Sequence, residues 1–135
     1  AYRRRPDVGA LVHTHSPWAT TFAILDRPIP PVHYVMGSIG DEIRIAPYST
    51  YGSHELAVAA VDGLGMDNAV LLQNHGVLAA GRDVRGALKN AIRVEYIAEL
   101  YWKASVLGEP RLLTPEDLRD VRARSAAKQM KGEMR

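Results

Sequence analysis

Two histidines separated by one residue, His13 and His15, follow directly on the apolar run of residues 8–12. A short apolar run of this kind predicts a β-strand that is covered on both faces. Residues i and i+2 of a strand share one face, so the two imidazoles can reach one point in space. Zinc takes nitrogen ligands at about 2.0–2.1 Å. The spacing therefore favours a pair of metal ligands, although two polar residues where a strand meets solvent would give the same pattern.

A third histidine, His75, follows another apolar run, residues 69–72, in the turn sequence Gln-Asn-His-Gly. If both strands belong to one sheet, their ends can bring His75 to the face of His13 and His15; a turn histidine beside a glycine is the alternative. The chain has no Cys, which leaves histidines and carboxylates as its strong metal ligands. Three protein nitrogens leave coordination positions open, as in catalytic zinc sites. We therefore predict a metal site at His13, His15 and His75.

Structural roles are sufficient to explain Tyr34, Ser16 and Pro17. Tyr34 can donate a proton, but its ordinary pKa is ~10, so from the residues alone we expect it to pack. Ser16 and Pro17 predict a helix start beside the first two histidines, whose positive end would favour negative charge there. A well-capped helix also accounts fully for that pair of residues.

The elements that must position these side chains alternate along the chain. Caps predict helices over residues 18–25, 54–64, 84–107 and from 115 onward. Apolar runs predict strands over residues 8–12, 32–36, 43–45, 69–72 and 77–80. Such a mixture is typical of the α/β class, and we expect one domain over residues 1–135.

Composition narrows the function classes. The 135 residues carry 17 Lys and Arg against 15 Asp and Glu, a net charge of +2. This balance argues against a nucleic-acid binder, which normally carries a larger, clustered basic excess. No apolar run reaches the ~18 residues that span a bilayer, and no signal peptide is visible. We expect a cytoplasmic protein without a membrane partner.

Four segments, taken together and in this order, resemble the class II aldolase/adducin family. They are Val-His-Thr-His-Ser-Pro within residues 8–20, Ile-Pro-Pro-Val-His-Tyr at 29–34, Ala-Pro-Tyr-Ser-Thr-Tyr-Gly-Ser at 46–53, and Leu-Leu-Gln-Asn-His-Gly within 71–78. Each motif alone is weak, and the set is specific. Within the family, the segment 29–34 most resembles the L-fuculose-phosphate aldolases.

The resemblance implies a three-layer α/β/α sandwich around a mostly antiparallel sheet, assembled as a homotetramer with fourfold symmetry. It implies that His13, His15 and His75 bind a divalent metal, usually zinc. It also implies that Tyr34 reaches the site of a neighbouring subunit and protonates the aldehyde oxygen there.

The reaction implied is the cleavage of a ketose 1-phosphate, such as L-fuculose 1-phosphate, into dihydroxyacetone phosphate and an aldehyde. The metal stabilises the enediolate. The same scaffold also carries sugar-phosphate epimerases, dehydratases and decarboxylases, which the three histidines cannot separate from aldolases. A non-catalytic, adducin-like oligomeric scaffold is a further alternative from a different class.

The sequence departs from the family pattern in three places. Family members carry an acid/base Glu shortly before the position of Ala1, and upstream Gly/Ser/Thr loops that bind the substrate phosphate. The C-terminal tail has no Tyr, where fuculose-phosphate aldolases can place one. We therefore expect an N-terminally truncated domain, its C-terminal metal-binding portion, with little cleavage activity by itself. We expect Asp41, Glu42 and Glu55 to lie on the surface rather than to replace the missing Glu.

Overall fold

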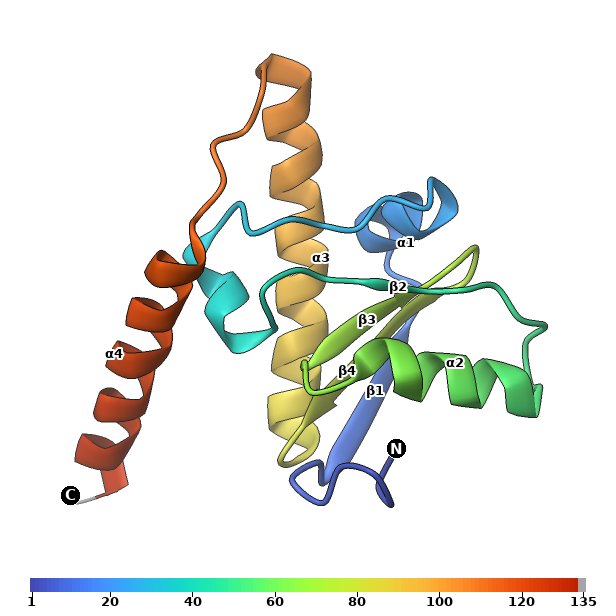
Figure 1. Cartoon of the computed structure of the whole chain (residues 1–135), viewed down its shortest axis with the longest axis horizontal. Coiled ribbons are helices and arrows are strands. Elements are labelled where there is room, and N and C mark those ends of the chain that lie inside the picture. The colour runs from blue at the N-terminus through green and yellow to red at the C-terminus, as the bar shows by residue number, and fades with distance from the viewer. Residues whose placement is uncertain (134–135) are drawn as a thin grey trace.

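The computed structural model describes the backbone of residues 1–133 and the side chains of residues 1–128. Four strands form one sheet in the order β1-β4-β3-β2 (Figure 1). They span β1 Ala10–Thr14, β2 Ile45–Ala46, β3 Ala69–Leu72 and β4 Gly76–Gly81. The α/β class is confirmed.

The sheet is mixed, which corrects the expectation of a mostly antiparallel one. β4 pairs antiparallel with β1 and β3, whereas β2 pairs parallel with β3. The parallel pair follows from the helix α2 (His54–Leu64), which lies between β2 and β3 in the chain. A helix of that length carries the chain back across the sheet, so that the next strand starts from the same edge.

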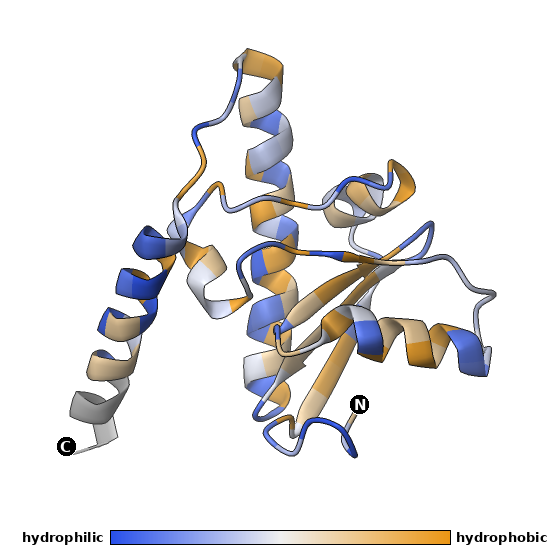
Figure 2. Cartoon of the chain, viewed as in Figure 1, coloured by the Kyte–Doolittle hydropathy of each residue, from blue (hydrophilic) through white to orange (hydrophobic). Residues whose placement is uncertain are grey.

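Helices cover both faces of the sheet. The helices α1 (Pro17–Ile24) and α3 (Val84–Leu107) pack on one face, and α2 packs on the other (Figure 1). Alternate residues of the strands divide between the two cores: Leu71 and Val77 face α1 and α3, whereas Val70 and Leu72 face α2. The strands are therefore hydrophobic along most of their length (Figure 2), with buried residues in a core on each face. No helix in the described part of the chain is both long and apolar enough to cross a bilayer.

Three helices begin at the capping residues that the sequence predicts. Ser53 Oγ and Asp83 Oδ1 each accept an N–H three residues further on, at 3.1 and 2.6 Å. At the start of α4 (Pro115–Glu133), the Asp117 N–H donates to Thr114 Oγ1 at 3.1 Å. The Thr114 N–H in turn donates to Asp117 Oδ2 at 2.8 Å. These bonds satisfy N–H groups that a helix end leaves without partners.

The strand predicted over residues 32–36 is wrong. The chain forms the 3-10 helix η1 (Tyr34–Ser38) there, and Met36 is buried with its N–H donating to the His33 carbonyl at 3.0 Å. The two prolines before it hold the backbone extended without supplying N–H donors for a sheet ladder. The residues that do pair are Ile29 and Ile43, in an isolated bridge. The tight turn also lets η1 pack against α4.

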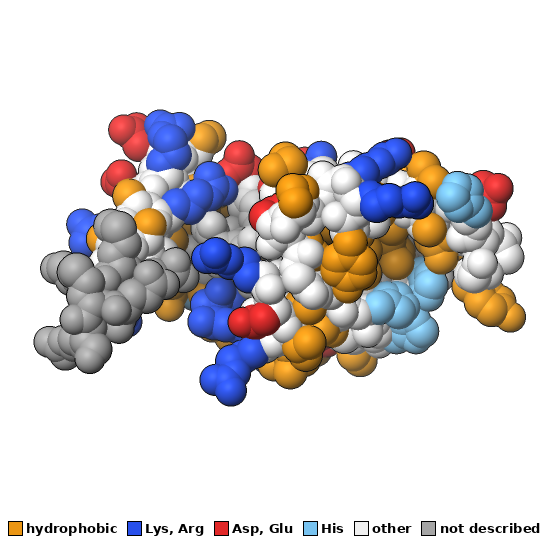
Figure 3. Space-filling model, turned by 90° about the horizontal axis from the view of Figure 1, so that it is seen from below, with side chains coloured by type: hydrophobic (Ala, Val, Ile, Leu, Met, Phe, Trp, Pro, Cys, Tyr) orange, Lys and Arg blue, Asp and Glu red, His pale blue; other side chains and the backbone are white. Residues whose placement is uncertain are grey.

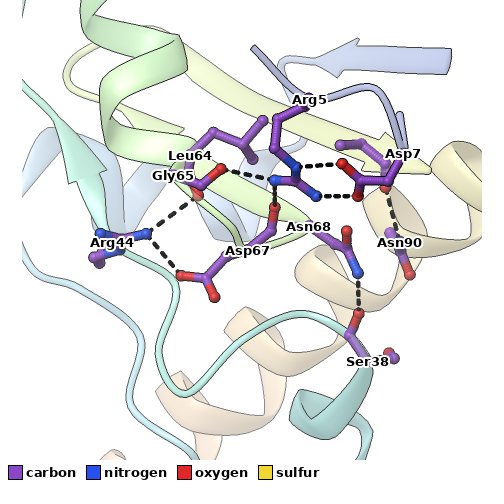
Figure 4. Close-up of polar contacts among 10 residues, drawn as sticks. Arg5, Asp7, Ser38, Arg44, Leu64, Gly65, Asp67, Asn68 and Asn90 are labelled. Carbon is purple, nitrogen blue, oxygen red and sulfur yellow. Dashed lines mark hydrogen bonds and ion pairs between the residues drawn. The ribbon is translucent and has the colours of Figure 1, made fainter. Parts of the chain in front are cut away.

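A buried arginine ties the N-terminal segment to the turn after α2 (Figure 4). Arg5 is 4% exposed and forms two bonds to the Asp7 carboxylate, at 2.8 and 2.7 Å. Its Nη1 also donates to the Gly65 and Asp67 carbonyls, at 2.7 and 3.0 Å. The hydrogen bond from Arg5 lowers the pKa of the Asp7 carboxyl. The guanidinium thus satisfies carbonyls of a turn that would otherwise lack partners.

Candidate metal centre

The strand β1 and its continuation place the first two histidines. His13 lies opposite Leu78 in the β1–β4 register, and His15 follows just after the strand ends. Both side chains are exposed, and their Nε2 atoms lie 2.9 Å apart. Two nitrogen ligands of one tetrahedral zinc ion lie roughly 3.3 Å apart. The i, i+2 spacing thus brings the two nitrogens close to the separation that one metal ion needs.

The turn between β3 and β4 places the third histidine. Asn74 has a φ of +54°, which Asn tolerates better than most residues, and the His75 N–H donates to the Leu72 carbonyl at 3.0 Å. The His75 ring lies 4.8 Å from that of His13 and 5.0 Å from that of His15, measured between centroids. One ligand atom from each histidine lies within 4.8 Å of the others. The structure therefore brings the three predicted ligands together.

Gly76 permits this approach. A Cβ built at Gly76 would lie 2.3 Å from the Thr14 carbonyl oxygen and 3.0 Å from His15 Cδ2. Real Cβ atoms do not come that close to a backbone oxygen, so any side chain would push the end of β1 away. The sequence indicates only the turn propensity of this glycine, not its role in spacing the histidines.

The donor set fits a divalent metal. His13 Nδ1 lies 2.8 Å from the Val77 carbonyl oxygen, which can only accept, so Nδ1 carries the proton and Nε2 keeps its lone pair. Partial burial, together with the neighbouring His13 and His15, lowers the pKa of His75 below its ordinary value. A lowered pKa keeps that imidazole neutral, which is the form that binds a metal. The Val77 carbonyl is a supporting contact that the sequence could not reveal.

Two hollows adjoin the histidines. One, of about 370 Å³, lies against α2 and is lined by His13, His75 and mostly apolar side chains such as Leu11, Leu56 and Leu72. The other, of about 320 Å³, is lined by His15, Tyr48, Ser49, Tyr51, Asn74 and His75. Figure 3 shows histidine side chains gathered beside hydrophobic ones on this face. The loop 47–53, where the sequence predicts only a connection, thus borders the site.

Tyr34 lies elsewhere in the same chain. It sits on η1, is 61% exposed, and lines a hollow shared with α3 and α4 rather than either hollow beside the histidines. Its ring lies 4.7 Å from that of His33. Within one chain, therefore, the structure does not bring Tyr34 together with His13, His15 and His75.

The carboxylates behave as predicted with one addition. All three predicted surface carboxylates, Asp41, Glu42 and Glu55, are exposed. None of them belongs to the histidine cluster. Glu95 on α3 accepts the N–H groups of Trp18 and Ala19, both at 2.9 Å. Glu95 therefore occupies the positive end of α1, which corrects the expectation that this helix end would stabilise negative charge at the histidines.

Comparison with known proteins identifies one family. The family profile described as "Class II Aldolase and Adducin N-terminal domain" matches residues 1–102. The chain is 45% identical over 116 residues to a 5-deoxy-D-ribulose 1-phosphate aldolase of Bacillus thuringiensis, covering 86% of this chain and 54% of that protein. It is 40% identical over 111 residues to an L-fuculose phosphate aldolase of Escherichia coli, covering 82% and 52%. The chain spans about half the length of these curated relatives.

A solved structure shares the fold closely. The structure titled "L-fuculose 1-phosphate aldolase" superposes with a TM-score of 0.90 at 38% identity, covering 93% of this chain and 59% of that one. The family resemblance indicated by the sequence motifs is thereby confirmed. Since the family profile spans well over half of the sequence and the relatives are close, the chain belongs to the class II aldolase and adducin family.

Proposed function

We propose that this chain forms the metal-binding part of an aldolase that cleaves a ketose 1-phosphate into dihydroxyacetone phosphate and an aldehyde. The observation that carries the proposal is the convergence of His13, His15 and His75 within 4.8 Å. These residues would hold one divalent ion, with zinc as the first choice because the donor set is nitrogen only. When bound, the ion supplies Lewis-acid stabilisation of negative charge on a substrate oxygen. The chain's own contribution is to fix three neutral imidazoles before the substrate arrives.

In this proposal, Tyr34 acts in the site of a neighbouring subunit. As the carbon–carbon bond forms, its hydroxyl donates a proton to the aldehyde oxygen. In the cleavage direction its phenolate accepts that proton from the substrate hydroxyl as the bond breaks. The exposure of Tyr34, and its position on η1 away from its own chain's histidines, support a role across a subunit boundary. Such a role requires an assembly, for which we propose a homotetramer acting in the cytoplasm.

The substrate is proposed as a phosphorylated ketose. The curated relatives are named for 5-deoxyribulose 1-phosphate and for L-fuculose phosphate, and this chain resembles both kinds of protein. We therefore propose L-fuculose 1-phosphate and 5-deoxyribulose 1-phosphate as the first two compounds to test.

The metal site is tested by titrating the metal-free chain with Co²⁺ and with Zn²⁺. We expect one equivalent to bind, with the visible absorption of cobalt in a low-coordinate nitrogen site. His75→Ala should abolish stoichiometric binding, because two imidazoles remain where three are needed.

The matched control is His54→Ala, since His54 is an exposed histidine at the start of α2 outside the cluster. This variant should bind one equivalent as the unaltered chain does. If the unaltered chain binds no stoichiometric metal, or if both variants lose it alike, the assignment of the site is wrong.

The reaction is tested on the gene product as the cell makes it. Release of dihydroxyacetone phosphate from each of the two ketose phosphates is measured with a coupled enzyme, before and after removal of metal. We expect release of dihydroxyacetone phosphate to stop when a chelator removes the metal and to return when zinc is added. If the protein binds metal but releases dihydroxyacetone phosphate from neither compound, the metal site stands and the two proposed substrates are wrong.

A further inference from the structure

A second concave region lies between η1, α3 and α4, away from the histidines. Two adjoining hollows of about 460 and 420 Å³ share Ser38, Lys89, Arg93 and Ser125 in their linings. Neither contains any of the three histidines, and none of the residues that line them lines the hollows beside the histidines. Within one chain the region is therefore separate from the histidines, and Tyr34 is the residue of the proposed reaction that lines it.

Positive charge collects in this region. Five basic side chains line the two hollows: Arg82, Lys89, Arg93, Arg122 and Lys128. The whole chain has a net charge of only +2, so the excess of basic side chains in this region does not follow from the overall composition.

The carboxylates in the lining are already engaged. Asp7 forms its two hydrogen bonds with Arg5, which lies outside both hollows. Asp83 accepts the N–H of Gly86 and caps α3. Among the described residues, Lys89 and Arg93 take part in no ion pair within 4.0 Å. Arg122 pairs with Asp41. Arg82, Lys89, Arg93 and Lys128 then remain without an ion pair among the described residues, so the cations still outnumber the acids that could neutralise them.

Arg93 is held in place before any ligand arrives. Its Nη1 donates to Ser38 Oγ at 2.7 Å, and Ser38 Oγ donates its own proton to the Val35 carbonyl at 2.9 Å. The Ser38 carbonyl is fixed in turn by Asn68 Nδ2, at 2.9 Å (Figure 4). A guanidinium has five N–H donors, so most of them remain available to a ligand. Fixing the side chain in advance reduces the entropy that binding would cost.

We propose that this region, defined by Ser38, Lys89 and Arg93, binds a small phosphate-bearing anion. A fixed guanidinium beside a flexible ammonium matches the geometry and charge of a phosphate group. Hollows of a few hundred Å³ are the size that small ligands occupy. The proposal goes beyond the aldolase reaction and uses neither the histidines nor a metal, while Tyr34 lines one of the two hollows.

The test is isothermal titration of inorganic pyrophosphate into the metal-free chain. We expect saturable binding of one equivalent. Lys89→Gln and Arg93→Gln should each weaken it about tenfold or more, the loss typical of a hydrogen bond between charged groups. Lys103→Gln is the control, because Lys103 lies on the same helix, lines neither hollow and is also exposed to solvent.

Two further measurements distinguish binding here from binding at the histidines or elsewhere on the surface. Amide chemical shifts should move at Ser38 and Gly86 on titration and stay fixed at Gly76, and His75→Ala should leave the affinity unchanged. Absence of saturable binding, an equal loss in Lys103→Gln, or a loss in His75→Ala would each overturn the proposal. Arg93→Lys, which keeps the charge, tests the role of Arg93 if Arg93→Gln does not fold, and should weaken binding while Lys103→Gln does not.

Discussion

At the residue scale, Gly76 determines how closely the β3–β4 turn approaches the end of β1. We predict that Gly76→Ala weakens metal binding and lowers the free energy of unfolding by about 1–3 kcal/mol, because the added methyl overpacks the contact. The added Cβ would lie 2.3 Å from the Thr14 carbonyl oxygen and 3.0 Å from His15 Cδ2. Metal titration and urea denaturation measure the two effects.

The control for this change is Gly108→Ala. Gly108 follows the end of α3, where an added Cβ meets nothing within 4 Å. It should bind metal as the unaltered chain does. Equal effects of the two substitutions on metal affinity would show that spacing at Gly76 is unimportant.

Tyr34 offers a second prediction at this scale. Tyr34→Phe removes one exposed hydroxyl, so metal content and stability should not change. If Tyr34 transfers a proton, the cleavage rate of the gene product should fall by about 10²–10⁴-fold. The rate of dihydroxyacetone phosphate release measures this. Tyr2→Phe, which alters another exposed tyrosine (57%) that lines neither hollow beside the histidines, serves as a comparison. An unchanged rate in Tyr34→Phe would remove Tyr34 from the proposed mechanism.

At the scale of elements, the Arg5 contacts connect the N-terminal segment to the turn that ends α2. The pKa of Asp7 is lowered, mainly by the hydrogen bond from Arg5, so the folded state favours the ionised carboxylate. Its contribution to stability is present above the unfolded pKa of about 3.8 and is lost as the pH falls through the lower folded value. Acid therefore weakens this connection.

We predict that Asp7→Asn reduces the loss of stability between pH 5 and pH 3. The asparagine cannot titrate, so the part of the loss that belongs to residue 7 disappears. Urea denaturation at the two pH values gives the comparison, with Asp120→Asn, an exposed acid on α4, as the control. A pH dependence identical to that of the unaltered chain would contradict the assignment to Asp7.

The elements differ in how far the sequence predicts them. The helix starts at Ser53, Asp83 and Thr114 follow from local hydrogen bonds, and the strands at 69–72 and 77–80 follow from short apolar runs. Local signals fail at residues 32–36, where valines favour a strand but packing against α4 favours the tight turn of η1. The parallel pairing of β2 with β3 depends on where α2 returns the chain, which no local signal contains.

The same distinction applies to the candidate site. The histidine convergence could be predicted because spacing within a strand and strand ends in one sheet both have simple geometry. The supporting contacts could not: the Val77 carbonyl, Glu95 at the start of α1 and buried Arg5 depend on pairs of residues far apart in sequence. For Arg5 the general preference of charged residues for the surface points the wrong way.

At the scale of the whole molecule, a bound ion would join β1 to the β3–β4 turn. Since the unfolded chain does not hold the three histidines together, we predict that zinc stabilises the fold. At a free concentration 100 times the Kd, the gain is about 2.7 kcal/mol. Thermal unfolding with and without zinc measures it, and His13→Ala should show no gain. An equal gain in His13→Ala would place the stabilising ion elsewhere.

The two hydrophobic cores on the faces of the sheet differ in size, and this difference affects which helix unfolds locally first. α1 and α3 share a large core, whereas α2 rests on a smaller one beside the 370 Å³ hollow. Local opening costs least where the fewest apolar side chains lose contact. We therefore predict that α2 detaches before α3 does, and that its departure uncovers the α2 side of β1 while the pairing of β1 with β4 persists. Amide hydrogen exchange should then be faster along α2 than along β1, which carries His13, and equal rates in the two elements would contradict this order.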